Sequence, residues 1–207
     1  MLQRSSEWFE ARKGKFTASQ IHRLLGKETL AKTKQSIDTY AFEKAVEIVY
    51  GVEEDGVVSF DMQRGIDLEP LAFRRFKELK SFEFVNVEET GFHILNKDSG
   101  ASPDGLLDNN ENLEIKCPRR TKFFKLVANG TEQVDKNYIA QMQHQMAATG
   151  TERTNFFNFY IEEGIEYWHN IVIERDEEMI ELIKERTEKA AILRDEYVEK
   201  LNENSQC

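Results

Sequence analysis

The sequence lacks the cysteine and histidine patterns of a structural metal site. It contains two cysteines, Cys117 and Cys207, and neither a CxxC pair nor Cys/His spacing occurs. We therefore expect no structural zinc. Cys117 is interpreted as a buried strand cysteine.

Long hydrophobic runs are also missing. No stretch of about 18 apolar residues occurs, so no membrane span is expected. The N-terminal residues lack the apolar core of a signal peptide, which predicts a cytosolic protein. Repeats and low-complexity linkers are absent as well. The 207 residues with 40% hydrophobic content suit one domain over residues 1–207.

The chain has no excess of positive charge, although such an excess is usual in nucleic-acid-binding proteins. Its net charge is −10. Residues 1–50 hold nine Lys and Arg against six Asp and Glu, whereas residues 174–207 hold six against eleven. The N-terminal part is therefore the candidate phosphate-facing surface, and the C-terminal part is interpreted as a solvated outer face.

A charged hairpin is present in the middle of the chain. Residues 101–107 predict one strand and residues 113–117 the return strand, with an Asp- and Asn-rich turn between them. Side chains alternate across a strand, so Glu114 and Lys116 share one face, and Asp104 on the partner strand can converge on it.

Such a group of charges has a specific chemistry. Two neighbouring carboxylates favour a divalent cation between them, and an all-oxygen site suits Mg²⁺ or Mn²⁺. Lys116 can then orient or deprotonate a water molecule, or stabilise charge on a phosphate. The alternative is an ordinary hairpin in which Glu114 and Lys116 form a same-face ion pair, because so short a pattern also arises by chance.

Several motifs in sequence order resemble a known family. Residues 102–106 (Ser-Pro-Asp-Gly-Leu) and 113–118 (Leu-Glu-Ile-Lys-Cys-Pro) resemble the core of the PD-(D/E)xK nucleases. More narrowly, they resemble the phage lambda exonuclease and YqaJ-type viral recombinase family. Further similar motifs are Trp8 with residues 12–19, Gly65 with Glu69, residues 138–143 and residues 172–177.

The resemblance implies a fold and an activity. The expected fold is α/β, with a mixed central β-sheet flanked by helices on both sides. The implied activity is a Mg²⁺-dependent 5′-to-3′ exonuclease that degrades one strand of double-stranded DNA from a 5′-phosphorylated end to mononucleotides, leaving a 3′ single strand for recombination. Family members form homotrimer rings and act with a phage single-strand annealing protein, which implies the cytoplasm of a bacterial host.

The resemblance also implies a metal site. Asp104, Glu114 and the Ile115 carbonyl are expected to hold one Mg²⁺, with Asp104 shared with a second ion and Mn²⁺ as a substitute. Glu69 is expected to assist directly or through water. Pro70 follows Glu69 directly, so the surrounding helix is expected either to bend or to begin there.

The helix predicted over residues 137–149 has a polar side, formed by Tyr138, Gln141, His144 and Gln145. Such a stripe is normally a solvated face. By resemblance, Gln141 lies in the active site and contacts Lys116, which orients the attacking water. His144 is interpreted as an ordinary helix histidine.

A second polar motif lies near the N-terminus. Residues 17–20 (Thr-Ala-Ser-Gln) have the form of a capping box, and free N–H groups at a helix start favour anions. A plain capped helix with exposed basic residues fits the same pattern. By resemblance, Arg12, Ser19 and Ser102 bind the 5′-phosphate.

Two basic segments are candidate DNA contacts. Lys27, Lys32 and Lys34 lie in a polar loop expected over residues 26–34, and Arg119 and Arg120 follow the central hairpin. Each segment can track a DNA backbone, and each also fits a solvated basic loop or turn.

The remaining patterns predict further elements. Helices are predicted over residues 6–12, 37–50, 62–79 and about 176–203. Strands are predicted over residues 82–87 with 91–95, as a hairpin, and over 154–160 and 165–173. The order strand, helix, strand predicts a crossover between parallel neighbours.

Two other functions remain open. A PD-(D/E)xK endonuclease of restriction or repair type would share the metal site, would need no 5′-phosphate pocket and would cut circular DNA. A non-catalytic DNA-binding module, or a protein that only binds an annealing partner, would need none of Asp104, Glu114 and Lys116, yet all three are present.

Overall fold

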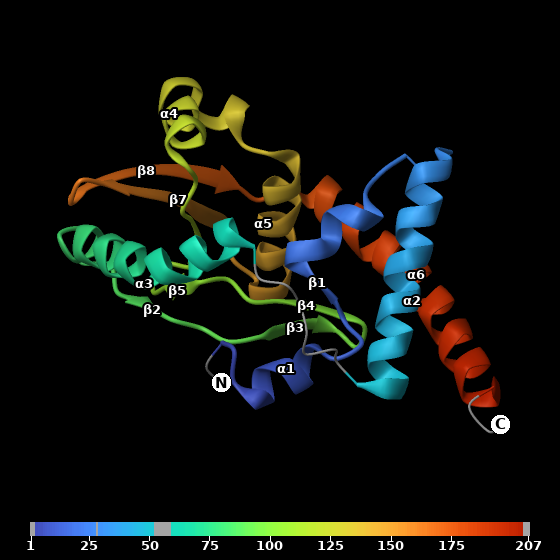
Figure 1. Ribbon diagram of the computed structural model, residues 1–207. Helices are drawn as coiled ribbons and strands as arrows, with labels where there is room; N and C mark the ends of the chain where they lie inside the picture. The colour runs from blue at the N-terminus through green and yellow to red at the C-terminus, as the bar shows by residue number, and fades with distance from the viewer. Residues whose placement is uncertain (1–2, 28, 52–58, 205–207) are drawn as a thin grey trace.

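The computed structural model describes residues 3–27, 29–51 and 59–204 (Figure 1). Its helices are α1 (Ser6–Arg12), the 3₁₀ helix η1 (Ala18–Leu24), α2 (Ala31–Tyr50), α3 (Phe60–Ser81), α4 (Arg120–Asn129), the 3₁₀ helix η2 (Gly130–Gln133), α5 (Lys136–Thr149) and α6 (Glu177–Asn204). Its strands are β1 (Phe16–Thr17), β2 (Val87–Glu88), β3 (His93–Asn96), β4 (Ser99–Ala101), β5 (Gly105–Leu107), β6 (Glu111–Lys116), β7 (Arg153–Glu162) and β8 (Ile165–Glu174).

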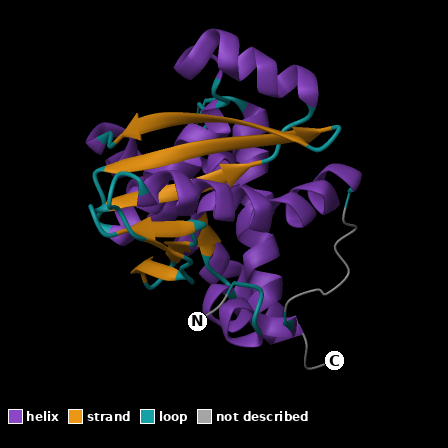
Figure 2. Cartoon of the chain, turned by 90° about the vertical axis from the view of Figure 1, so that its left-hand side faces the viewer, coloured by secondary structure: helices purple, strands orange, loops and turns teal. Residues whose placement is uncertain are grey.

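The larger sheet has the strand order β2-β5-β6-β7-β8. Strands β6 and β7 are parallel, whereas the other pairs are antiparallel. Helices α4 and α5 lie in the connection between β6 and β7, so the predicted crossover between parallel neighbours is confirmed. The sheet is mixed, as expected, and its two longest strands run across the upper part of Figure 2.

Helices cover both faces of this sheet. On one face, Phe76 of α3 packs with Leu113 and Phe157 in a buried apolar cluster. On the other face, Met142 of α5 packs with Phe156. Neighbouring strand residues point to opposite faces, so Phe156 and Phe157 belong to the two different clusters. The expected α/β fold with helices on both sides is confirmed.

A second sheet, with the order β1-β4-β3, lies beside the first. Its strand β4 and the strand β5 of the larger sheet divide the stretch that predicts one strand over residues 101–107, so that prediction is wrong. Pro103 lies between β4 and β5 and has no N–H to donate, which interrupts a hydrogen-bonded ladder. The hairpin of β5 and β6 is confirmed, with Gly105 opposite Leu113.

The hairpin predicted over residues 82–87 and 91–95 is also wrong. Strand β2 pairs with β5, and β3 pairs with β4. Phe84 has a φ of 58°, in the left-handed region, and the Val85 N–H donates to the Lys80 carbonyl at 3.1 Å. The chain therefore closes the end of α3 here, because left-handed backbone cannot extend as a strand.

Residues 17–20 do not form the predicted capping box. η1 is a 3₁₀ helix, and Thr17 makes no side-chain cap to it. Thr17 pairs with Gly100 in the second sheet, and its N–H donates to the Tyr40 hydroxyl at 3.1 Å. The helix predicted to start after Thr17 is therefore present, but as a 3₁₀ helix, and the side-chain cap predicted for it is not formed.

Other helix bounds differ less from the sequence prediction. α1 has the predicted bounds, and α5 begins one residue early. α2 begins at Ala31, so Lys32 and Lys34 lie in its first turns rather than in a loop. α3 continues through Pro70, so it does not begin there.

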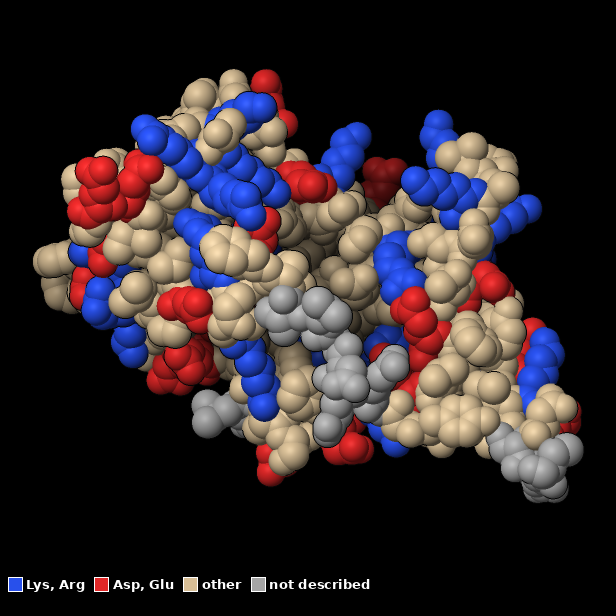
Figure 3. Space-filling view, viewed as in Figure 1, with Lys and Arg blue, Asp and Glu red and all other residues tan. Residues whose placement is uncertain are grey.

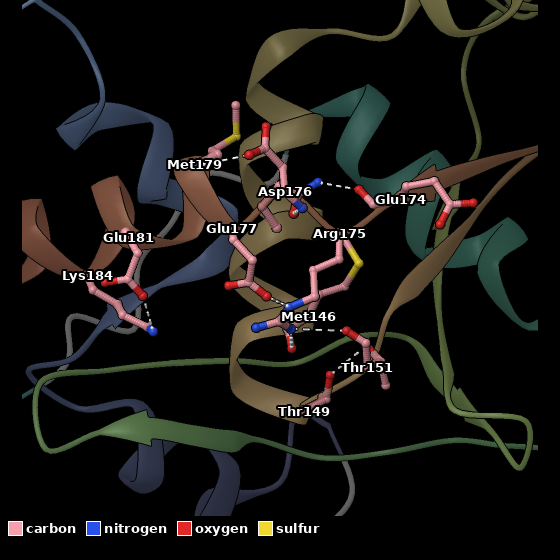
Figure 4. Close-up of polar contacts among 11 residues, drawn as sticks. Met146, Thr149, Thr151, Glu174, Arg175, Asp176, Glu177, Met179, Glu181 and Lys184 are labelled. Carbon is pink, nitrogen blue, oxygen red and sulfur yellow. Dashed lines mark hydrogen bonds and ion pairs between the residues drawn. The ribbon is translucent and has the colours of Figure 1, made fainter.

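Helix α6 connects the sheet to the N-terminal segment. Where it begins (Figure 4), Arg175 donates to the Met146 carbonyl of α5 at 2.8 Å. Further along, Arg194 donates to the Gly14 carbonyl at 2.9 Å and to Asp98 at 2.7 Å. In the described ranges, no helix is long and apolar enough to cross a membrane.

Candidate functional site

The central hairpin fixes Asp104 next to the strand that carries Glu114. The Asp104 N–H donates to the Leu113 carbonyl at 2.9 Å. Its Oδ2 atom accepts from the Ile115 N–H at 2.6 Å. The two partners are the residues on either side of Glu114, so Asp104 and Glu114 meet as the strand pattern predicts.

The Glu114 carboxylate is surrounded by donors. Its Oε1 atom accepts from Gln141 Nε2 at 2.7 Å and from the Lys116 ammonium. Its Oε2 atom accepts from Gln145 Nε2 at 2.6 Å. The Glu114 side chain is only 2% exposed, and a buried carboxylate is tolerated only when such donors compensate for lost water.

Lys116 stays charged in this setting. Burial lowers the pKa of its ammonium, but the charges of Glu114 and Asp104 and the hydrogen bond to Glu114 outweigh burial, so the pKa is raised overall. An ammonium with a raised pKa holds its proton at neutral pH. Of the three roles considered, orienting a water molecule and stabilising negative charge fit a charged ammonium, and deprotonating water does not.

Three carboxylates act on one another at the site. Burial raises the pKa of Asp104 well above its usual value, and the charges of Glu114 and Glu69 raise it further, against the lowering effect of Lys116. Burial also raises the pKa of Glu69, although Arg4 offsets part of the effect. An added cation would relieve this repulsion.

A cavity of about 280 Å³ adjoins these carboxylates and is lined by Glu69, Asp104 and Ile115. Glu69 therefore faces the site, although Pro70 follows it in the same helix. Among the residues described, no three Asp, Glu, His or Cys side chains form a ready metal cluster, and Glu114 is turned toward its three donors. The carboxylate oxygens and their unbalanced charge nevertheless fit a hard divalent cation.

A larger cavity, of about 750 Å³, adjoins the same cluster through Lys116 and Gln141. It is also lined by Tyr138, whose ring centroid lies 5.1 Å from Lys116 Nζ and 5.0 Å from Lys122 Nζ. Figure 3 shows Lys and Arg side chains on both sides of a hollow in this face. Cations and an aromatic ring around a concave surface are features that bind nucleic-acid strands.

The three predicted phosphate-binding residues are only partly brought together. Arg12 Nη1 lies 3.4 Å from Ser102 Oγ. Burial lowers the pKa of Arg12 to about 10, which leaves it charged at neutral pH. Ser19 is exposed on η1 and lines the larger cavity with Lys116. In the part of the chain that is described, no hydrogen bond joins Ser19 to Arg12 or Ser102.

The sequence of this site matches one family model. The model of the YqaJ-like viral recombinase domain matches residues 7–152, a range that includes Arg12, Glu69, Asp104, Glu114 and Gln141. The chain belongs to the YqaJ-like viral recombinase family.

Solved structures resemble this YqaJ-like chain over nearly its full length. An alkaline exonuclease from Laribacter hongkongensis is 29% identical, with a TM-score of 0.81 over 98% of both chains. The same exonuclease in complex with dAMP is 28% identical, with a TM-score of 0.79 and the same coverage. A phage-related exonuclease from Haemophilus somnus is 16% identical, with a TM-score of 0.69 over 90% of this chain and 96% of the other, and shares the fold. No curated protein sequence matches the chain.

The basic candidates of this YqaJ-like chain differ in their surroundings. Arg119 lines the larger cavity and pairs with Asp61 at 2.5 Å. Arg120 pairs with Glu162 at 3.2 Å. The lysines near the start of α2 are exposed and do not line that cavity, namely Lys27, Lys32 and Lys34. Of these five residues, Arg119 is the one that lines the larger cavity together with Lys116.

Three residues at the site were not predicted to act there. Gln145 contacts Glu114, and its signal was the spacing of four residues from Gln141 on the same helix face. Trp8 contacts Ser102, and Arg4 contacts Glu69. Both contacts cross long sequence separations, so no local pattern could have revealed them.

His144 is not part of this group. Its side chain is fully buried, and within the described residues neither ring nitrogen has a hydrogen-bond partner. Burial lowers its pKa to about 4. A neutral imidazole without access to solvent or to the cavity is not placed for catalysis, in agreement with its interpretation as an ordinary helix histidine.

Proposed function

We propose that the protein is a Mg²⁺-dependent exonuclease that digests one strand of double-stranded DNA in the 5′-to-3′ direction from a 5′-phosphorylated end, releases mononucleotides and leaves a 3′ single strand for recombination. The family and the similarity to alkaline exonucleases support nuclease chemistry. A relative was crystallised with dAMP, a deoxynucleoside monophosphate of the kind that such a reaction releases.

One observation carries the end-directed part of the proposal. Gln145 Nε2 donates to Glu114 at 2.6 Å and also lies 3.4 Å from the Ser102 carbonyl. A single side chain thus connects the carboxylate cluster to the donors Arg12 and Ser102. A terminal phosphate held by these donors would keep the chain end close to the carboxylates, whereas an endonuclease has no use for such a site.

The metal ion is assigned to the oxygen-lined region. Asp104, Glu114 and the Ile115 carbonyl would hold one Mg²⁺, with Glu69 assisting and a second ion sharing Asp104. Mn²⁺ fits the same oxygen ligands. When bound, such ions polarise the phosphate and stabilise the leaving oxygen.

Two residues act on the attacking water in this proposal. The Lys116 ammonium orients the water and stabilises negative charge on the phosphate. Gln141 and Lys116 both donate to the Glu114 Oε1 atom. Gln141 therefore helps to hold the carboxylate next to the ammonium. Arg12 and Ser102 bind the 5′-phosphate, with Ser19 contributing from the neighbouring cavity.

The assembly proposed with this activity is a homotrimer ring around DNA in the cytoplasm of a bacterial host, acting with a phage single-strand annealing protein. Family resemblance supports it. Three copies of a net charge of −10 would repel DNA, so a channel must be locally basic. Arg119 and the lysines at the start of α2 are the candidate residues for that lining.

The experiment that tests the activity uses linear duplex DNA labelled separately at each 5′ and 3′ end, with and without 5′-phosphate, in Mg²⁺. A closed circle of the same DNA is the control. We expect early release of 5′-terminal mononucleotides, faster from phosphorylated ends, with the circle intact. Cutting of the circle would support an endonuclease instead, and no cutting in Mg²⁺ or Mn²⁺ would support a binding module.

A further inference from the structure

The short helix α1 presents two side chains to the second sheet. Trp8 and Arg12 are four residues apart, so they lie on the same side of the helix. The Arg12 guanidinium carbon lies 3.9 Å from the centroid of the Trp8 ring, which is the geometry of a cation–π contact. Trp8 therefore restricts where the guanidinium can lie.

Both side chains meet at Ser102, which lies between β4 and β5. The Trp8 indole Nε1–H donates to Ser102 Oγ at 2.9 Å, and Arg12 Nη1 donates to the same oxygen at 3.4 Å. A hydroxyl oxygen has two acceptor positions and one proton. Since both acceptor positions are engaged, the proton must point away from Trp8 and Arg12. Within the described ranges, no acceptor receives it.

Trp8 has little role in the apolar core. Helix α1 contains no buried residue, and Trp8 belongs to none of the three buried apolar clusters. Its side chain contacts the stacked guanidinium, the Ser102 hydroxyl and, edge to face, the Phe9 ring at 5.0 Å. A half-buried indole with such contacts acts on polar neighbours more than on packing.

We propose that Trp8 is a positioning residue for 5′-end specificity, which fixes the Ser102 hydroxyl as a hydrogen-bond donor and holds Arg12 beside it. The proposal rests on the proposed function and extends it. Arg12 and the Ser102 hydroxyl then both offer donors, and a phosphate monoester presents only acceptors when it is doubly ionised. A 5′-hydroxyl end has no charge to offer and fewer acceptor atoms for these donors, so the pair favours the phosphorylated end.

The first test measures the ratio of kcat/KM for 5′-phosphorylated ends to that for 5′-hydroxyl ends. Trp8→Phe keeps an aromatic face for Arg12 but removes the N–H donor. We expect this ratio to fall about threefold to tenfold, the size of one lost neutral hydrogen bond. Trp168→Phe, on the exposed side of β8, is the matched control and should leave the ratio unchanged.

A double-mutant cycle separates positioning from a general structural effect. If Trp8 acts through the Ser102 hydroxyl, Trp8→Phe should lower the ratio much less when Ser102→Ala is already present. If Trp8→Phe lowers the ratio equally with and without Ser102→Ala, the proposal is overturned. Such additive effects would mean that Trp8 acts independently of the Ser102 hydroxyl, as a general structural defect does.

A binding measurement requires no substitution at Trp8 and no catalysis. The chain has two tryptophans, so in Trp168→Phe the fluorescence reports Trp8 alone. We expect a short duplex with a 5′-phosphate, in EDTA, to change this fluorescence, and the same duplex with a 5′-hydroxyl to change it much less. Equal responses to the two duplexes would overturn the proposal.

The outcomes also distinguish this proposal from the function beneath it. If Arg12→Ala lowers the preference for phosphorylated ends and Trp8→Phe does not, the Trp8 proposal fails and the phosphate site remains. If the wild-type protein shows no preference for phosphorylated ends, the phosphate site itself fails, and the Trp8 proposal fails with it.

Discussion

Gln145 and Glu114 are joined by a hydrogen bond of 2.6 Å between Nε2 and Oε2, on the side of the carboxylate opposite to Gln141. The two glutamines lie one turn apart on α5, and each donates a hydrogen bond to a different oxygen of the Glu114 carboxylate. Helix α5 thus sets the orientation of Glu114, and the β6 strand sets its position. Neighbours that orient a metal-binding carboxylate commonly tune both affinity and activity.

The first prediction concerns Gln145→Leu. The substitution removes a donor from a buried carboxylate, so the free energy of unfolding should fall by about 1 to 3 kcal/mol. With Glu114 as the Mg²⁺ ligand proposed above, cleavage should fall about tenfold to a hundredfold, as when residues that orient metal ligands are removed. Chemical denaturation and initial rates on labelled duplex DNA measure the two effects.

Gln143→Leu is the control for this substitution. Gln143 is equally buried on α5, but it donates to the Glu174 carbonyl at 2.8 Å and accepts from the Asp176 N–H at 2.8 Å, away from the carboxylates. We expect a comparable loss of stability with unchanged cleavage by the folded protein. Equal losses of activity in both variants would mean that Gln145 has no specific role.

Lys116→Ala should abolish cleavage while DNA binding persists. Removing one charge-stabilising donor typically costs about a hundredfold to a thousandfold in rate. Lys122→Ala is the matched variant, because Lys122 approaches the same Tyr138 ring at 5.0 Å but has no contact with Glu114 in the described structure. It should weaken binding and reduce the salt dependence of binding by about one phosphate contact. If Lys122→Ala lowered the cleavage rate as much as Lys116→Ala does, the separate roles of the two lysines would be contradicted.

The pH dependence of stability should reveal His144. Burial lowers its pKa from 6.5 to about 4 in the folded protein, and the unfolded chain keeps a value near 6.5. Between these two pH values, His144 therefore binds a proton in the unfolded state but not in the folded state. As the pH falls from about 6.5 to about 4, this group should remove up to about 3 kcal/mol of stability.

Carboxylates also titrate in this range, so the difference between wild type and His144→Leu isolates the histidine. Denaturant unfolding from pH 4 to pH 8 should give a shallower decline for the variant at low pH. Parallel stability curves for the two proteins would mean that His144 contributes nothing to acid sensitivity.

The central elements of this fold follow from local patterns in the sequence. Alternation around Glu114 and Lys116 gives β6, and the helix predicted over residues 137–149 is α5 within one residue. These signals are local, and the structure preserves them. The placement of Asp104 follows from the same hairpin register, even though the strand before it is interrupted at Pro103.

The errors in the sequence prediction have tertiary causes. Thr17 pairs with β4, and its N–H donates to the Tyr40 hydroxyl. These tertiary contacts accompany the loss of the side-chain cap that the local sequence predicts. Phe84 adopts a left-handed backbone to close α3, which an apolar run does not reveal. The Trp8–Ser102 contact spans 94 residues and could only be found once the fold had brought α1 to the second sheet.

The last prediction concerns the ion pair between Arg4 and Glu69, at 3.2 Å. Arg4 lines the same cavity as Asp104, where it neutralises part of the charge that a divalent cation would otherwise meet. Arg4→Ala should therefore tighten Mn²⁺ binding, measured by calorimetry without DNA. Both side chains are partly exposed, so screening limits the gain in Mn²⁺ affinity to about twofold to fivefold.

Arg23→Ala is the control, because it breaks a pair with Glu43 at 2.6 Å that does not line this cavity. It should leave Mn²⁺ affinity unchanged. Weaker Mn²⁺ binding in Arg4→Ala would mean that Arg4 supports the carboxylates rather than competing with the ion for them.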